Sequence, residues 1–290
     1  MLNNLIVFAN GEYISSDEVK ISPFDHGFLY GLGLFETFRI YEGHPFLLDD
    51  HLARLNEGLR TLGIKAEYRR HEILPILKGL LAANSLENAY VRMNVSAGNG
   101  EIGLQTAEYE EPNLILFMKP LGTPSQLGEK KLALLNIRRN TPEGATRLKS
   151  HHYLNNILAK RELGASSEAE GIFLTREGFL AEGIVSNLFW TEGETLFTPS
   201  VETGILNGIT RQFVMKLAGK LQLGVQEGFY PQEALLEAEE LFVTNSIQEV
   251  VPVSMFGQKT FPGKEGRVVQ ALSRQYGECR RKLWTRNSLQ

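Results

Sequence analysis

Cysteine is almost absent from the 290-residue sequence, which contains only Cys279. A single cysteine can form no internal disulfide and leaves no cysteine cluster for a metal ion. Long apolar runs are absent as well, since a run such as Leu114–Met118 is far shorter than the ~20 residues that span a bilayer. The N-terminal segment also lacks the basic region and apolar stretch of a signal peptide. We therefore expect a cytoplasmic protein with no metal site and no membrane partner.

An excess of positive charge is also lacking, because 30 Lys and Arg residues face 34 Asp and Glu residues, for a net charge of −4. Nucleic-acid binding relies on a broad positive field, so we expect no nucleic-acid partner. The sequence has no G-x-G-x-x-G segment after a strand and no G-x-x-x-x-G-K-[ST] segment. Gly31–Glu36 (GLGLFE) lacks the third glycine, so it does not indicate a dinucleotide site.

The remaining composition is that of a folded globular protein, with 42% hydrophobic and 22% charged residues. At roughly 150 residues per domain, the length predicts two domains. Turn-forming residues concentrate in 121–131, which we predict to be a linker between an N-terminal domain (1–120) and a C-terminal domain (132–290). Strand and helix patterns alternate irregularly in both halves, which predicts an α+β fold and not a regular βαβ sheet.

Apolar spacing and turn residues locate the main elements. Asn10-Gly11 between two short apolar segments predicts a β-hairpin. Leu52, Leu55 and Leu59 would share one face of a helix. A second helix is expected to end near Asn84, on the spacing of Ile73, Leu74, Leu77 and Leu80. Further expected elements are helices near 150–163 (apolar face Leu154, Ile157 and Leu158), from Thr210 and from Val268 to Leu283, and strands that include 131–139.

Several polar residues stand where chemistry could be placed. Lys149 immediately precedes a predicted helix, and Glu182 precedes a strand and the pair Ser186-Asn187. Taken alone, each is more common as a surface or turn residue. Asn207–Thr210 opens a helix, whose free N–H groups could bind a phosphate, although Thr210 could equally be an ordinary N-cap.

Two further features could complete a phosphate site. Thr244–Ser246 forms a second small polar turn after a strand, where it could bind a phosphate or merely turn the chain. Arg54 could balance a dianion, although a lone arginine on an amphipathic helix is commonly solvated.

In this order and spacing the segments resemble the fold-type IV pyridoxal-phosphate enzymes, the class IV aminotransferase family. That family includes branched-chain aminotransferases, D-amino acid aminotransferases and 4-amino-4-deoxychorismate lyases. The resemblance covers nearly the whole chain and is closest to the lyases of the Bacillus type. It is carried by Phe24–Arg39 (FDHGFLYGLGLFETFR), 137–162 (IRRNTPEGATRLKSHHYLNNILAKRE) and Glu170–Trp190 (EGIFLTREGFLAEGIVSNLFW).

The resemblance implies a small N-terminal α/β sandwich, a larger C-terminal pseudo-barrel domain, and pyridoxal 5'-phosphate as cofactor. It implies that Lys149 forms the Schiff base with the cofactor and that Glu182 pairs with the pyridine nitrogen. Tyr153 matches a tyrosine that touches the ring hydroxyl, at a spacing that varies within the family. The positions that match the phosphate site are Arg54, Ile209, Thr210, Asn245 and Ser246.

The resemblance to the lyases implies a reaction of folate biosynthesis, in which 4-amino-4-deoxychorismate gives 4-aminobenzoate and pyruvate. Lys149 would remove a proton from the substrate, and pyruvate would be eliminated as the ring becomes aromatic. Thr37 matches a threonine that lies near the reacting carbon in lyases, although a β-branched strand residue is an equally good explanation of it. Ser96 and Gly98 stand where D-amino acid aminotransferases have a carboxylate-binding Arg and His, which disfavours that reaction.

Two other functions stay open at this point: an aminotransferase acting on D-amino or branched-chain amino acids, and a homologue that only binds the cofactor. The substrate of the lyase carries two carboxylates, for which Arg92, Arg138 and Arg139 are candidate partners. Adjacent residues of a strand point to opposite faces, so at most one of Arg138 and Arg139 would face the site. Surface ion pairing is the alternative for each arginine. Family members are homodimers in which a loop like Ser96–Glu111 reaches the neighbouring site, so the resemblance also implies a homodimer.

Overall fold

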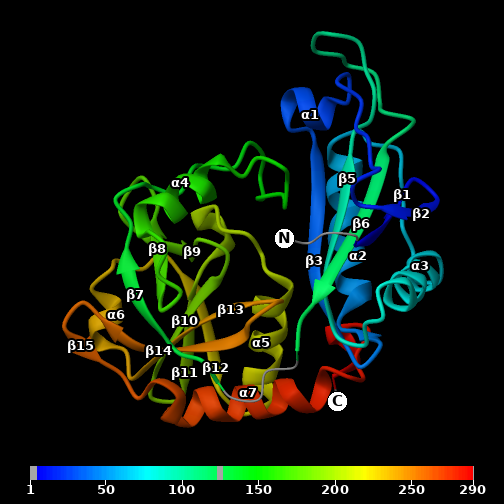
Figure 1. Ribbon diagram of the computed structural model, residues 1–290. Helices are drawn as coiled ribbons and strands as arrows, with labels where there is room; N and C mark the ends of the chain where they lie inside the picture. The colour runs from blue at the N-terminus through cyan, green and yellow to red at the C-terminus, as the bar shows by residue number, and fades with distance from the viewer. Residues whose placement is uncertain (1–4, 123–126, 290) are drawn as a thin grey trace. The chain divides into compact units, whose positions relative to one another are not determined.

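The computed structural model describes residues 5–122 and 127–289, which divide into two compact units (Figure 1). Unit 1 comprises Met1–Thr123, Leu148–His152 and Arg280–Gln290, and unit 2 comprises Pro124–Arg147 and Tyr153–Cys279. The predicted linker 121–131 lies partly outside the described residues, at 123–126. The domain boundaries expected from the sequence stay a prediction.

Unit 1 is built on an antiparallel sheet of six strands in the order β2-β1-β6-β5-β3-β4. The hairpin predicted at Asn10-Gly11 joins β1 to β2, and both turn residues have positive φ. A second hairpin joins β3 to β4 through Glu42-Gly43. The strands are β1 (Ile6–Ala9), β2 (Glu12–Ser15), β3 (Gly33–Tyr41), β4 (His44–Pro45), β5 (Ala89–Ser96) and β6 (Asn113–Pro120).

Helices pack on one face of this sheet. Unit 1 contains α1 (His26–Tyr30), α2 (Leu48–Thr61), α3 (Arg70–Ala83) and the 3₁₀ helix η3 (Arg286–Ser288). Leu52, Leu55 and Leu59 of α2 are buried in a core shared with β3, β5 and β6, as their spacing predicts. Leu34 and Phe38 of β3 belong to the same core, so alternation turns Phe35 and Thr37 to the opposite face of the sheet.

Unit 2 contains a curled, nine-stranded mixed sheet in the order β12-β11-β10-β13-β14-β7-β8-β9, to which β15 adds beside β14 (Figure 1). The pairs β11–β12, β14–β7 and β7–β8 are parallel, and the remaining pairs are antiparallel. Its strands are β7 (Lys130–Leu134), β8 (Ala169–Leu174), β9 (Leu180–Gly183), β10 (Asn187–Glu192), β11 (Thr195–Pro199), β12 (Gly224–Gly228), β13 (Glu240–Asn245), β14 (Glu249–Phe256) and β15 (Lys259–Thr260). The predicted α+β fold, with a smaller N-terminal sheet and a larger C-terminal one, is confirmed.

The helices of unit 2 are α4 (Leu154–Leu163), α5 (Ile209–Lys220), α6 (Ala234–Glu237) and α7 (Arg267–Cys279), with the 3₁₀ helices η1 (Val201–Thr203) and η2 (Gly263–Glu265). The predicted helix near 150–163 is present, and its apolar face is exposed. Leu154, Ile157 and Leu158 are exposed, whereas Asn156 and Ala159 are the buried residues of the helix. Asn156 satisfies its buried amide by donating to the carbonyl of Ile184.

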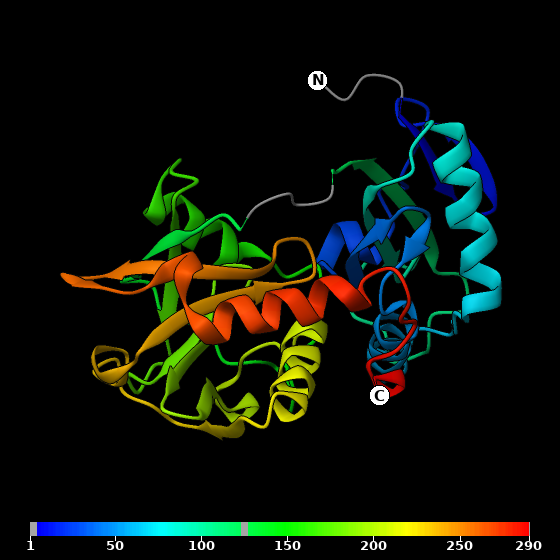
Figure 2. The ribbon, with the colours of Figure 1, turned by 90° about the horizontal axis from the view of Figure 1, so that it is seen from below.

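Three elements are shorter than the sequence patterns predict. The helix expected near 150–163 begins at Leu154. The strand expected over 131–139 ends at Leu134, and α7 ends at Cys279 instead of Leu283. The residues that follow α7 belong to unit 1, where the Leu283 carbonyl accepts from Leu47 N–H and the Trp284 ring packs edge-on against His44. Figure 2 shows this C-terminal segment beside α2.

No helix among the described residues is long and apolar enough to cross a membrane.

Gly98 is a position where steric contact and backbone conformation both require glycine. Its φ is +81°, and a β-carbon there would lie 2.0 Å from the carbonyl oxygen of Glu111. Gly43 has φ +80°, but a β-carbon there would meet no atom within 4 Å. Gly43→Ala is expected to cost about 1 kcal/mol for its left-handed backbone. Gly98→Ala is expected to cost a further ~1–3 kcal/mol, because the backbone must move to relieve the overlap.

Urea denaturation of the two variants measures this difference. Equal free energies of unfolding for Gly43→Ala and Gly98→Ala would contradict the close approach of residues 98 and 111.

Candidate active site

Lys149 is positioned by backbone pairing with the start of β3. The Lys149 carbonyl accepts from Phe35 N–H at 2.9 Å, and His151 N–H donates to the Gly33 carbonyl at 3.0 Å. The Lys149 ammonium nitrogen lies 4.6 Å from the centroid of the Phe35 ring. The lysine is therefore held on the Phe35 face of the sheet, the face opposite α2.

Arg92 and Thr37 lie on the same face. They are cross-strand partners in β5 and β3, so their side chains project together. The Arg92 guanidinium carbon lies 3.6 Å from the Phe35 ring centroid, and its Nε donates to Asn94 Oδ1 at 3.0 Å. Unit 1 thus brings together three of the residues selected from the sequence: Lys149, Arg92 and Thr37.

The His151 ring lies so close to Gly33, in the GLGLFE segment, that residue 33 must be a glycine. A β-carbon at Gly33 would lie 2.5 Å from His151 Cε1, so this close approach of ring and strand needs a glycine. The imidazole stacks on Phe35 with a centroid distance of 6.3 Å. Burial, reinforced by the charge of Arg92, lowers the pKa of His151 below its ordinary value.

Arg54 forms a fork-like ion pair within unit 1. Its Nε and Nη2 donate to the two oxygens of Glu36 at 2.7 and 2.8 Å, and Glu36 also contacts His51 Nδ1 at 2.7 Å. Burial would raise the pKa of Glu36, but Arg54 and His51 outweigh burial and lower it to about 2. Glu36 and His51 were not selected from the sequence, because nothing in the sequence shows that β3 packs them against Arg54.

Glu182 is buried in β9 and held through both oxygens. Oε1 accepts from Arg139 Nε at 2.7 Å and lies 3.8 Å from Arg147 Nε, and Oε2 accepts from Leu206 N–H at 3.0 Å. Burial, followed by repulsion from Arg139, lowers the pKa of Arg147 to about 10. Two guanidinium groups thus compensate the buried carboxylate, and its orientation is fixed.

The two adjacent arginines have different environments. Arg139 is buried and also donates to Asn155 Oδ1 at 2.7 Å, whereas Arg138 is exposed. Strand alternation, on which the prediction for the pair was based, does not apply, because both residues follow the end of β7 and lie in irregular chain. Tyr153 is half-buried at the N-cap of α4.

The two polar turns selected from the sequence meet in unit 2. Thr210 Oγ1 and Ser246 Oγ are 3.2 Å apart. Ile209 and Thr210 form the first turn of α5, which has no side-chain cap and no acidic residue. Asn245 differs from its neighbours, because its side chain closes its own turn by accepting from Ile247 N–H and Gln248 N–H.

This donor set fits a phosphate group. Free N–H groups at the start of a helix and two adjacent hydroxyls are donors that an anion requires. The turn is also closely packed, since a β-carbon at Gly208 would lie 2.1 Å from Asn187 Oδ1. Asn187 in turn donates to the Leu206 carbonyl at 2.9 Å, which holds the chain just before the helix.

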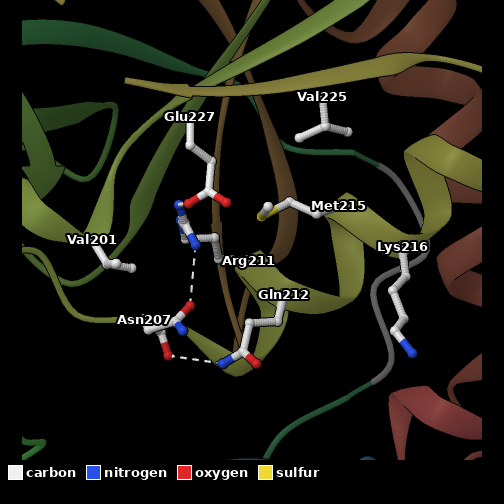
Figure 3. A pocket seen from close by; sticks show the side chains of 8 residues that line it. All are labelled: Val201, Asn207, Arg211, Gln212, Met215, Lys216, Val225 and Glu227. Carbon is white, nitrogen blue, oxygen red and sulfur yellow. Dashed lines mark hydrogen bonds and ion pairs between the residues drawn. The ribbon is translucent and has the colours of Figure 1, made fainter. Parts of the chain in front are cut away.

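The Arg211 side chain is directed toward Asn207, in the turn that precedes α5 (Figure 3). Its buried guanidinium donates to Asn207 Oδ1, to the Pro199 carbonyl and to Glu227, and Gln212 donates to the Asn207 carbonyl. These groups line an open pocket of about 410 Å³. Arg211 was not selected from the sequence, because its partner Glu227 lies 16 residues away on β12 and only the fold brings the two together.

Within the described residues, no three His, Cys, Asp or Glu side chains are grouped so that they could hold a metal ion.

Known proteins resemble this chain over most of its length. An aminodeoxychorismate lyase of Bacillus subtilis (strain 168) is 46% identical over 273 residues, 93% of each chain. The crystal structure of 4-amino-4-deoxychorismate lyase from Pseudomonas aeruginosa has a TM-score of 0.81 and 26% identity, covering 94% of this chain and 98% of that one.

The crystal structure of the branched-chain amino acid aminotransferase from Escherichia coli has a TM-score of 0.84 and 26% identity, covering 96% of this chain and 95% of that one. The family model for amino-transferase class IV matches residues 33–256. That match includes the lysine, the buried carboxylate and both polar turns, and the chain belongs to the class IV aminotransferase family.

Proposed function

We propose that the protein is a pyridoxal-phosphate-dependent lyase that converts 4-amino-4-deoxychorismate to 4-aminobenzoate and pyruvate. The similarity to the Bacillus subtilis lyase over nearly the whole chain carries the proposal. The shared face of Lys149, Arg92 and Thr37 supports it, because it combines a proton carrier with a cation for a carboxylate substrate.

The cofactor is assigned to donors of matching chemistry. The hydroxyls of Thr210 and Ser246, with backbone groups of Ile209 and Asn245, would bind its phosphate, and Arg54 is a further candidate for it through the resemblance to the family. Glu182 would pair with the pyridine nitrogen, and Tyr153 with the ring hydroxyl. Once bound to Lys149, the cofactor supplies an electron sink for the electrons released at the substrate carbon.

Separate residues of the chain would transfer the proton, flank the reacting carbon and bind a substrate carboxylate. The Lys149 amine, freed when the amino group of the substrate takes its place on the cofactor, would take the proton from the ring carbon that bears that amino group. The released electrons would expel the enolpyruvyl oxygen, and the enol that leaves would take up a proton to give pyruvate. Thr37 lies on the face where that carbon would be held. Arg92 would bind a substrate carboxylate, whereas Arg139 is engaged with Glu182 and Arg138 is exposed. Arg92 is therefore the strongest of the three arginine candidates.

The lyase reaction is tested with purified holoprotein and enzymatically generated 4-amino-4-deoxychorismate. Equal amounts of 4-aminobenzoate and pyruvate are expected. Lys149→Ala is expected to reduce the rate of product formation by ~10²–10⁴-fold or more, because proton transfer by a positioned side chain accelerates a reaction by a factor of this size. Borohydride reduction followed by mass spectrometry should attach the cofactor to the Lys149 peptide in the unmodified protein.

A different lysine carrying the cofactor would contradict the assignment of Lys149. Formation of a keto acid from D-alanine or leucine with 2-oxoglutarate, without 4-aminobenzoate, would replace the lyase with an aminotransferase. Cofactor binding without either reaction would favour a protein that only binds it.

The phosphate site is tested through Thr210→Val. A hydrogen bond to a charged group contributes roughly 1.5–3 kcal/mol, so cofactor binding should weaken by about 10- to 100-fold. Equilibrium dialysis of the apoprotein measures the dissociation constant, with Ser166→Ala as a control that removes an exposed hydroxyl elsewhere in unit 2. Binding of pyridoxal, which has no phosphate, should not change. An equal loss for pyridoxal would show that Thr210 does not act on the phosphate.

We also propose that the protein forms a homodimer. In unit 1 the large apolar side chains of Phe28, Ile102 and Leu104 are 72%, 80% and 92% exposed. The loop that bears Ile102 and Leu104 is tied to α1, because Gly103 N–H donates to the Tyr30 hydroxyl. Unit 2 exposes the apolar face of α4. Apolar patches on a soluble protein mark interaction surfaces, and a second copy would cover both patches.

Light scattering at micromolar concentration should give twice the mass of one chain. The double variant Ile102→Asp/Leu104→Asp is expected to give the mass of one chain, since two buried carboxylates would oppose the interface. Leu236→Asp, which changes an exposed apolar residue of α6, is the control and should remain dimeric. A monomeric unmodified protein would rule out the homodimer.

A further inference from the structure

We propose that Arg92 controls the protonation of Lys149: its guanidinium, held on the same aromatic ring, disfavours the ammonium form of the lysine. This inference rests on the proposed function and deepens it. A lysine must be neutral to bond to an aldehyde or to take a proton from a substrate carbon. An isolated lysine is almost entirely charged at neutral pH, so the site needs a device that opposes the charge.

The Phe35 ring brings the two cations together. The Arg92 guanidinium carbon lies 3.6 Å and the Lys149 nitrogen 4.6 Å from the ring centroid, so the two groups can be no more than about 8 Å apart. Phe35 is only 2% exposed, so little water lies around the ring that they share. Like charges at this distance beside a buried ring repel appreciably.

Arg92 differs from Arg54 and Arg139 in the groups that its guanidinium contacts. Arg54 is paired with Glu36, and Arg139 is paired with Glu182. Among residues 5–122 and 127–289, the guanidinium of Arg92 contacts the Asn94 amide oxygen and the Phe35 ring, and no carboxylate neutralises it. Its field therefore acts on Lys149 without being cancelled locally.

The other groups that face Phe35 leave this effect intact. Arg92 is anchored on β5, between β3 and β6 in the sheet, and its Nε is bound to Asn94. His151 stacks on the ring, and burial, followed by Arg92, lowers its pKa, which favours the neutral imidazole. Asp25, whose charge acts on His151 in the opposite sense, accepts hydrogen bonds from Gly27 N–H, Ser96 and Asn113. Thr37, opposite Arg92, carries no charge.

The arrangement also couples substrate binding to proton transfer. A substrate carboxylate that binds Arg92 would cancel the charge that acts on Lys149. The amine would then become a stronger proton acceptor at the moment when the substrate is in place. Arg92 would in this way link carboxylate recognition to the basicity of the lysine.

The experiment measures the pKa of Lys149 in the apoprotein. Trace acetic anhydride is added between pH 7 and 11, and mass spectrometry quantifies acetylation of the Lys149 peptide. Arg92→Gln is expected to raise the pKa of Lys149 by about one unit, a roughly tenfold smaller neutral fraction at neutral pH. Arg92→Lys keeps the charge and should stay close to the unmodified protein.

Asn94→Asp provides a nearly isosteric second variant. It places a carboxylate on Arg92 without removing it, so the pKa of Lys149 should again rise by about one unit. Lys119→Gln is the matched control, because it removes an exposed cation that stands over Tyr90 on the same sheet. It should leave the pKa of Lys149 unchanged.

An unchanged pKa in both Arg92→Gln and Asn94→Asp would overturn the proposal, as would an equal shift in Lys119→Gln. Circular dichroism checks that each variant is folded, and Asn94→Asp decides the matter if Arg92→Gln is not. The labelling uses neither cofactor nor substrate. Its failure would therefore leave the lyase reaction standing, and a negative product assay would leave the effect of Arg92 on Lys149 standing.

Discussion

The site depends on the short antiparallel pairing between residues 149–151 and the start of β3. Two backbone hydrogen bonds, from Phe35 to Lys149 and from His151 to Gly33, connect segments that are more than 110 residues apart in the chain. They determine which face of the sheet receives the lysine. A side chain as flexible as lysine gains little from its own contacts, so a fixed backbone and one aromatic ring must limit where its amine can go.

Two of the buried carboxylates, Glu36 and Glu182, are the second constraint, and both are held by the same kind of contacts. Glu36 and Glu182 each accept from an arginine at 2.7 Å and from a second donor. Removing one partner of such a pair leaves an uncompensated buried charge, which is costly. The pairing therefore fixes the position of the carboxylate as well as its charge. Glu182 is thereby held in one orientation, which suits the role proposed for it, and Glu36 limits the movement of Arg54.

The sequence predicted those features that depend on local order and missed those that depend on packing. Lys149, Glu182, Thr210 and Ser246 were identified because their segments resemble a known family, and the two polar turns do meet. Glu36, His51 and Arg211 were missed, since their partners are brought together only by the folded sheets. The apolar spacing of α4 correctly indicated a helix with an apolar face, but spacing cannot show whether a face is covered by the same chain.

Arg92, the cation over the Phe35 ring, is the group that bears on which reaction is catalysed. A lysine, a buried carboxylate and a phosphate site serve transamination as well as elimination, so they do not separate the two. The roles proposed for the groups on the Phe35 face are to hold a substrate that carries carboxylates and to control the proton transfer. Arg92 stands without a carboxylate partner among the described residues, on the same ring as the Lys149 amine to which the proton transfer is assigned under the proposed function. An arginine paired with a buried carboxylate at close range, as Arg139 is with Glu182, would perform neither task, since its charge would already be cancelled.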